Sequence, residues 1–293
     1  MITQNFTLCD TITKEHKRFF PKEASLSQIS FTSVYIWQKP YEYKAFETPS
    51  ALFVYYKYGE RFFAMPPFGE YTEEDIALFR EYIGKPIAFV PLSDTEKERL
   101  SAISDSYVYK PIRSMFDYIY KTEELISLKG SRYHGKRGHI SHFFSSYTTE
   151  YIKITPENLS VLSDAADALF ALSPDLEDEH IAIKTAIENF EMLDLKAAVL
   201  KADGAFAAYS IASVLGDTAL IHFEKADRAL NGAYPAICNS FLREELSDTV
   251  YADREEDMGI EGLRKSKLSY HPLLLKEAYL AYHVDDEKIY SEL

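Results

Sequence analysis

Residues 196–224 read KAAVLKADGAFAAYSIASVLGDTALIHFE and predict three consecutive strands. Three apolar runs are separated by two short polar breaks, a pattern typical of buried strands joined by turns. The breaks are Asp203-Gly204 and Gly216-Asp217, and both pairs favour the tight turns that connect neighbouring strands. This stretch therefore predicts the centre of a sheet.

The elements expected on either side of this stretch complete a mixed order of helices and strands. Thr155-Pro156-Glu157 combines a cap residue with a first-turn proline, which indicates the start of a helix. We expect a strand at 149–154, helices at 155–172 and 179–193, and, after the three strands, a helix at 233–246, a strand at 250–252, a helix at 260–269 and a strand after Pro272. The order β-α-α-β-β-β-α-β-α-β is that of the Gcn5-related N-acetyltransferase fold, a mixed sheet that splays between its fourth and fifth strands.

The first half of the chain has a comparable order of expected elements. A helix near 27–38 precedes three strands, and residues 72–75 (TEED) cap a further helix. Because no sequence repeat links the halves, the duplication rests on element order alone. We predict an α+β protein of tandem acetyltransferase-like domains with mixed sheets flanked by helices: a degenerate N-terminal domain at 1–128 and a C-terminal domain at 129–293 that starts with a basic linker helix.

The charge of the chain is strongly negative overall but locally reversed. The formal net charge is −14, yet residues 125–149 contain no Asp or Glu and carry four Lys or Arg side chains. This window predicts a local anion-binding surface rather than a general affinity for nucleic acid. The two cysteines, the absence of a signal-peptide pattern and the absence of an apolar run of about 20 residues predict a cytoplasmic protein with no transmembrane segment.

Residues 253–272 (DREEDMGIEGLRKSKLSYHP) have the composition of a binding site. The acids lie before Gly262 and most of the bases follow it, so one end suits a cation and the other suits an anion. An ordinary solvated helix intersperses its charges.

Several short motifs together resemble a family of uncharacterised bacterial proteins related to the soluble C-terminal domain of phosphatidylglycerol lysyltransferases. They are Phe31–Trp37, Asp117–Tyr120, Lys129–His139, His222–Asp227, Gly232–Tyr234, Arg254–Gly259 and Tyr270–Pro272. The resemblance covers essentially the full chain. It implies a tandem acetyltransferase-like fold and the transfer of an aminoacyl group from transfer RNA to a lipid headgroup, with peripheral contact with a membrane as a candidate interaction.

Acyl transfer requires a base for the proton of the acceptor, and Glu224 is the candidate. It follows His222 and Phe223 at the end of an apolar strand, where the sheet would splay. The alternative is a structural ion pair with Lys225 or Arg264.

The substrate is expected to meet the acids of the 253–272 stretch. Glu255 and Asp257, with Glu256 between them, could hold a small cationic amine or an aminoacyl group such as lysyl, although Arg254 and Arg264 could neutralise them instead. Tyr234 and Tyr270 complete the substrate candidates. Tyr270 is also, with Tyr133, a candidate for stacking on a terminal adenosine.

A phosphorylated donor would need cations and backbone N–H groups. The candidates for its phosphates are Lys129, Lys136, Arg137, Arg264 and Lys267, with Tyr133 beside them. Coenzyme A-dependent members of the fold use Arg/Gln-x-x-Gly-x-Gly/Ala at a helix start, and the loop at 227–235 departs from this pattern at Ala229 and Tyr234. No metal site is expected.

Three functions remain open on this evidence. The first is an aminoacyl or acyl transferase, with aminoacyl-transfer RNA or acyl-coenzyme A as co-substrate and transfer RNA as partner. The second is a non-catalytic binding module for a small cationic metabolite, and the third is an acetyl-coenzyme A-dependent amine N-acetyltransferase. The sequence names neither the donor nor the acceptor.

Overall fold

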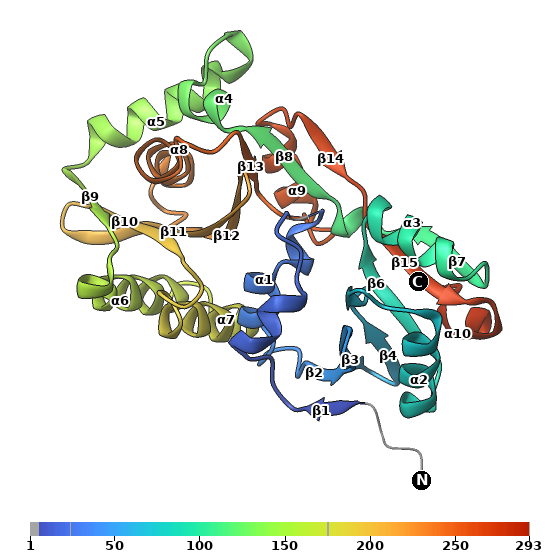
Figure 1. Ribbon diagram of the computed structural model, residues 1–293. Helices are drawn as coiled ribbons and strands as arrows, with labels where there is room; N and C mark the ends of the chain where they lie inside the picture. Colours follow the sequence, from blue (N-terminus) through green and yellow to red (C-terminus); the bar gives the residue numbers. More distant parts are fainter. Residues whose placement is uncertain (1–5, 24, 175, 293) are drawn as a thin grey trace. The chain divides into compact units, whose positions relative to one another are not determined.

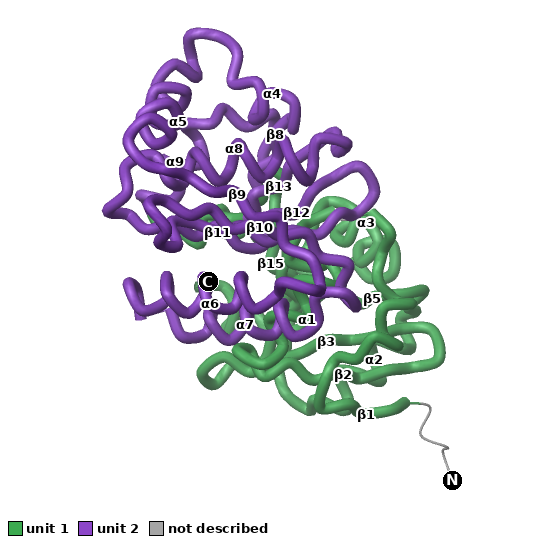
Figure 2. The backbone as a smooth tube through the Cα atoms, turned by 90° about the vertical axis from the view of Figure 1, so that its left-hand side faces the viewer, with its two compact units in different colours: residues 1–117, 256–260, 276–293 green, residues 118–255, 261–275 purple. Residues whose placement is uncertain are grey.

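A computed structural model describes residues 6–23, 25–174 and 176–292, and it divides the chain into two compact units (Figures 1 and 2). Unit 1 comprises Met1–Asp117, Glu256–Ile260 and Lys276–Leu293, and unit 2 comprises Tyr118–Glu255 and Glu261–Leu275. Each unit has its own sheet and its own apolar core.

Unit 1 is built on a mixed sheet in the order β1-β2-β3-β4-β6-β15-β7, with β5 paired to β3. Its strands are β1 (Thr7–Cys9), β2 (Lys44–Glu47), β3 (Ala51–Tyr58), β4 (Arg61–Ala64), β5 (Phe68–Gly69), β6 (Ile87–Leu92), β7 (Tyr107–Pro111) and β15 (Tyr279–His283). Its helices are α1 (Phe31–Trp37), α2 (Glu73–Ile83), α3 (Asp94–Ile103) and α10 (Glu287–Tyr290). The Thr72 cap expected for α2 is present, because its hydroxyl accepts from the Asp75 N–H.

Unit 2 is built on a second mixed sheet in the order β14-β8-β13-β12-β11-β10-β9. Its strands are β8 (Asp117–Lys121), β9 (Thr149–Lys153), β10 (Lys196–Ala202), β11 (Ala205–Leu215), β12 (Thr218–Ala226), β13 (Tyr251–Asp253) and β14 (Leu274–Lys276). Its helices are α4 (Thr122–Ser127), α5 (His134–Ser146), α6 (Leu159–Phe170), α7 (Glu177–Glu188), α8 (Ala233–Glu245) and α9 (Glu261–Leu268). The element order expected from the sequence is confirmed, as is the α+β class with mixed sheets flanked by helices.

The three strands predicted at 196–224 form the antiparallel centre of this sheet. The turn between β10 and β11 places Asp203 at φ 50° and Gly204 at φ 84°. A tight hairpin turn needs positive φ at both positions, which explains the Asp-Gly pair.

The division of the chain into units differs from the domain boundary expected between residues 128 and 129, because the two halves of the chain exchange strands. β8 comes from the first half but pairs with β13 in the sheet of unit 2, while β15 comes from the end of the chain and pairs with β6 and β7 of unit 1. The helix expected to link the domains, α5, instead packs against α8 within unit 2. Pairing between distant strands is not visible in local sequence patterns, so the exchange escaped the sequence analysis.

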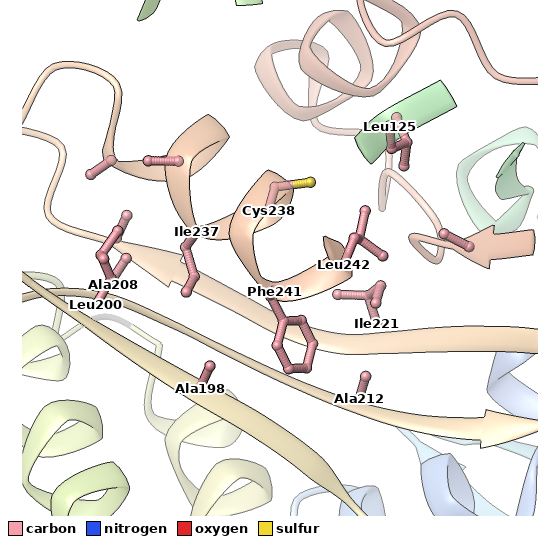
Figure 3. Packing of buried hydrophobic residues seen from close by; sticks show 14 of the residues in the cluster. Leu125, Ala198, Leu200, Ala208, Ala212, Ile221, Ile237, Cys238, Phe241 and Leu242 are labelled. Atoms are coloured by element: carbon pink, nitrogen blue, oxygen red, sulfur yellow. The ribbon is translucent and has the colours of Figure 1, made fainter. Parts of the chain in front are cut away.

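Helices cover both faces of the unit 2 sheet, with α5 and α8 on one face and α6 and α7 on the other (Figure 1). Beneath α8 the sheet presents small side chains, including Ala198, Ala208 and Ala212, which let Phe241 approach closely (Figure 3). This close packing fixes the position of α8 over β12, and the candidate site lies at the end of that strand.

Candidate active site

The sheet of unit 2 opens between β12 and β13. These parallel strands pair only from Thr218↔Tyr251 to Leu220↔Asp253, whereas β12 continues to Ala226 alongside β11. The ladder between β11 and β12 shifts register at His222, which marks a bulge. Bulges re-aim side chains, and here side chains of β12 and of the segment that follows β13 bridge the opening.

Glu224 and Arg254 form the first of these bridges. The Arg254 guanidinium donates from Nη2 to Glu224 Oε1 at 2.6 Å, and both side chains are 11% exposed. The guanidinium also lies 4.7 Å from the centre of the Tyr270 ring. Its Nη1 is buried and has no hydrogen-bond partner among the described residues. A buried charged donor without a partner is costly, so this nitrogen is a natural contact for a bound anion or carbonyl oxygen.

Lys136 of α5 brings a second cation to the same ring. Its Nζ lies 3.9 Å from the centre of Tyr270, and the side chain is half-buried. Burial, and then the neighbouring Arg254, lower the pKa of the Lys136 ammonium. Lys136 and Arg254 thus share the Tyr270 ring, and a lysine with a lowered pKa can give up a proton more readily than a solvated one.

Cys238 of α8 also contacts Glu224 in this cluster. Burial raises the pKa of the Cys238 thiol to about 12, and its hydrogen bond with Glu224 acts in the same direction. The thiol therefore stays protonated at neutral pH, which suits a hydrogen-bond donor and not a nucleophile.

His222 and Glu255 form the second bridge. The imidazole Nδ1 lies 2.9 Å from Glu255 Oε1, and Nε2 lies 2.7 Å from Ser213 Oγ. Glu255 adopts a left-handed backbone conformation with φ 56°, which its N–H stabilises by donating to Asp253 Oδ1 at 2.8 Å. A strained backbone conformation of this kind persists only where the surrounding contacts hold it in place.

Lys267 of α9 braces the same segment from its other side. The side chain is buried, and its ammonium donates to the carbonyl oxygens of Arg254 and Glu255. These contacts favour a structural role within the site over the contact with a donor phosphate that the sequence predicted. Arg264, on the same helix, is half-buried.

The protein is expected to lose stability between pH 7 and 5 because of His222. Burial lowers the pKa of His222 to about 3, whereas an unfolded histidine titrates near 6.5. Below about pH 6.5 His222 binds a proton in the unfolded chain but stays neutral in the folded chain. The free energy of unfolding is therefore highest above that pH and falls progressively as the pH approaches the pKa of the folded state. Urea unfolding should show a loss of about 2 kcal/mol at pH 5 relative to pH 7, and His222→Gln should remove most of it. An equal loss in the variant would contradict the assignment.

The acids at 255–257 do not form one cluster of unpaired carboxylates. Glu255 binds His222 in unit 2, whereas Glu256 and Asp257 belong to unit 1. There Gln28 donates to Glu256 at 2.9 Å, and Arg113 donates to the fully buried Asp257 at 3.0 Å. The expected selection of a cationic group by these acids finds no support in this arrangement, because each acid already has a partner.

The basic window also includes side chains engaged within the protein. Tyr133 is buried and donates to the carbonyl of Tyr270, so its ring is not available for stacking on a base. Arg137 is exposed, and its Nη1 donates to the carbonyl oxygens of Leu128 and Gly130. Lys129 is exposed and lines a shallow depression that also contains Lys121, Glu123, Glu124, Ser127, Arg132 and Tyr133.

The start of α8 is covered by the backbone of α5. Gly232 precedes α8 with φ 92°, and a Cβ at this position would lie 2.2 Å from the carbonyl oxygen of His139. The His139 side chain lies 3.1 Å from Asn231 through Nδ1 and Oδ1. A helix start is where coenzyme A-dependent members of the fold hold pyrophosphate. At Gly232 this contact excludes any side chain.

A pocket beyond the end of β12 was missed by the sequence analysis, except for Tyr234. It is lined by Leu169, Phe170, Ser173, Leu176, Glu179, His180, Ile183, Tyr209, Lys225, Ala226, Arg228 and Tyr234. The residues come from three helices, two strands and the segments between them. The Glu179-His180 pair at a helix start is too common a pattern to single out. The pocket adjoins the charged cluster along the chain, because Lys225 follows Glu224 and Tyr234 precedes Cys238 by one helical turn.

The chain belongs to the family described as phosphatidylglycerol lysyltransferase, C-terminal, whose model matches residues 21–282. This confirms the resemblance found in the sequence motifs. Among the described residues, no helix combines the length and the apolar character needed to cross a membrane.

Three proteins similar to this chain are described below by their identity and coverage. An uncharacterised protein of Mycoplasmoides gallisepticum is 26% identical over 178 residues, a match that spans 57% of this chain and 56% of that relative. The crystal structure of a conserved protein of unknown function from Bacteroides thetaiotaomicron has 27% identity and a TM-score of 0.84, and the match covers 95% of this chain and 99% of that one. The C-terminal domain of a putative lysylphosphatidylglycerol synthetase from Agrobacterium fabrum has the same fold, with 15% identity, a TM-score of 0.64 and coverage of 92% and 90%.

Proposed function

We propose that unit 2 transfers an aminoacyl or acyl group to an amine or hydroxyl acceptor, with aminoacyl-transfer RNA as the donor. The observation that carries the proposal is Arg254, a buried cation whose Nη1 lacks a partner among the described residues, at the point where the sheet opens. Membership of the lysyltransferase family supports the same reaction class. A transfer-RNA donor also makes the cytoplasm the expected compartment.

Each residue of the cluster has a role in this reaction. The acceptor nitrogen or oxygen attacks the ester carbonyl of the donor and forms a new C–N or C–O bond, while its proton passes to the carboxylate of Glu224. Arg254 Nη1 donates to the oxyanion that develops on the carbonyl oxygen. The C–O bond to the ribose then breaks, and the leaving oxygen takes a proton from the Lys136 ammonium. No further reactant is needed.

Aminoacyl-transfer RNA is preferred over acyl-coenzyme A because the loop before α8 departs from the coenzyme A pattern at Ala229 and Tyr234. A transfer RNA requires phosphate contacts on a basic surface instead, and the exposed Lys129 with the half-buried Lys136 can supply them.

Replacing Glu224 by Gln should separate catalysis from binding. Gln keeps an acceptor for Arg254 but cannot take a proton at neutral pH, so we expect single-turnover transfer to fall by about 100-fold or more with transfer-RNA affinity within about 2-fold. If Glu224 only positions Arg254, Gln should preserve most of the rate and the pH profile. Selective binding of a small metabolite with no turnover on any donor would favour the binding-module alternative.

Replacing Lys129 and Lys136 by Ala should weaken transfer-RNA binding. For each phosphate that a removed ammonium no longer neutralises, the slope of log K against log salt should become shallower by about 0.7 to 0.9. The control is Lys57→Ala in unit 1, whose ammonium faces Glu60 and whose side chain is 48% exposed. Fluorescence anisotropy at several salt concentrations measures both the affinity and the slope. An unchanged slope in the double variant would show that these two lysines do not contact the phosphates of the donor.

A further inference from the structure

The pocket beyond β12 combines apolar walls with charges that are already paired. Leu169, Phe170, Leu176 and Ile183 supply apolar surface from α6, α7 and the segment that joins them. Lys225 donates to Glu179 across the pocket lining in an ion pair in which both side chains are about three-quarters buried. The carboxylate of the lining is therefore occupied by a cation of the protein itself.

The charges around the pocket disfavour a cationic ligand. The charged lining residues are Glu179, Lys225 and Arg228, one acid against two bases. Asp167, which lies behind His180, is engaged by the ammonium of Lys184 at 2.6 Å and by His180 Nε2 at 3.2 Å. A lysyl side chain entering here would meet a net positive lining and would have to displace Lys225 to reach Glu179.

His180 supplies a hydrogen-bond acceptor for the ligand. Its ring stacks on Phe170, with the ring centres 4.1 Å apart and an 8° angle between the planes, which fixes the imidazole. Since Nε2 faces Asp167, we assign the ring proton to Nε2, and Nδ1 then carries a lone pair. This Nδ1 is buried and has no hydrogen-bond partner among the described residues. A buried acceptor in this state suits an N–H group of a ligand.

We propose that this pocket holds the aminoacyl group itself and selects an uncharged, apolar or aromatic side chain against a cationic one. The side chain packs between Phe170 and Ile183, and the α-amino group donates to His180 Nδ1. This inference rests on the proposed function, whose reacting cluster shares strand β12 and helix α8 with the pocket: Lys225 follows Glu224, and Tyr234 lies one helical turn before Cys238. It names a substrate class other than the lysyl group expected from the acids at 255–257.

Amino acid amides test the selection without any turnover, because they carry the α-amino group and the carbonyl but no transfer RNA. Calorimetry on the full chain should show that phenylalaninamide or leucinamide binds at least about 10-fold more tightly than lysinamide. Lys225→Met should leave Glu179 without its partner and shift the ratio toward lysinamide by about 10-fold or more. Equal or tighter binding of lysinamide by the wild type, or an unchanged ratio in Lys225→Met, would overturn the proposal.

Two further variants control this experiment. Lys184→Met removes a lysine from a comparable ion pair with Asp167 outside the pocket lining, and it should leave the ratio unchanged. Glu179→Gln removes the carboxylate, so it should not shift the ratio of affinities toward lysinamide. This variant tests the role of Glu179 even if Lys225→Met folds poorly. Selective binding without aminoacyl transfer would support the pocket assignment and contradict the proposed function. Transfer without selective binding would support the proposed function and contradict the pocket assignment.

Discussion

Replacing Arg254 by Met is expected to reduce single-turnover transfer by about 1,000-fold and to lower the free energy of unfolding by about 3 to 5 kcal/mol. The transfer rate falls because Met cannot donate to an oxyanion. The stability falls because Glu224, 11% exposed, would be left as a buried carboxylate without its cation. Urea unfolding and a rapid-quench assay measure the two effects separately.

A double variant separates these two effects of Arg254. Glu224→Met combined with Arg254→Met removes both charges, so much of the stability should return, because a buried ion pair can be replaced by apolar side chains at little cost. Transfer should not return. Recovery of transfer in the double variant would show that Arg254 supports only the fold.

Replacing Gly232 by Ala is expected to destabilise unit 2 by about 3 kcal/mol or more. The backbone at Gly232 has φ 92°, which a residue with a Cβ rarely adopts, and the added Cβ would lie 2.2 Å from the His139 carbonyl oxygen and 3.0 Å from the Phe143 Cβ. The backbone of α5 would have to move away from α8, and Lys136 would move with it. Thermal and urea unfolding measure the cost.

Gly138, on the helix that Gly232 contacts, is the matched control. It is helical, and a Cβ there would meet nothing within 4 Å. Gly138→Ala should therefore be neutral or stabilise the protein by up to about 1 kcal/mol. Similar destabilisation by both variants would show that the α5–α8 contact is not as close as described.

Local patterns were sufficient for the element order of unit 2 and insufficient for the division of the chain. The Asp203-Gly204 turn and the apolar runs around it depend on neighbouring residues, so their strands could be predicted. The places of β8 and β15 depend on pairing across more than 100 residues of chain, for example between Ala252 and Tyr120, which no local pattern encodes.

The candidate site was predictable only where a residue type and a strand end coincide. Glu224 could be found because it follows an apolar run near the end of β12, but its partner Arg254 was interpreted as a neutraliser of neighbouring acids. The partners of Asp257 and Lys267 likewise come from distant segments or from backbone carbonyls. Side-chain burial, which decides whether such a charge contacts ligand or protein, appears only in the folded chain.

The central claim is that unit 2 moves an aminoacyl group from transfer RNA to an acceptor, and a transfer assay tests it most directly. Bacterial transfer RNA charged with labelled amino acids would be incubated with the protein, an extract of small amines and vesicles containing phosphatidylglycerol. We expect label to leave transfer RNA and appear in an extractable amide or ester, with a rate at least about 100-fold lower for Glu224→Gln. Label that stays on transfer RNA, or that leaves it equally fast with wild type and variant, would contradict the claim.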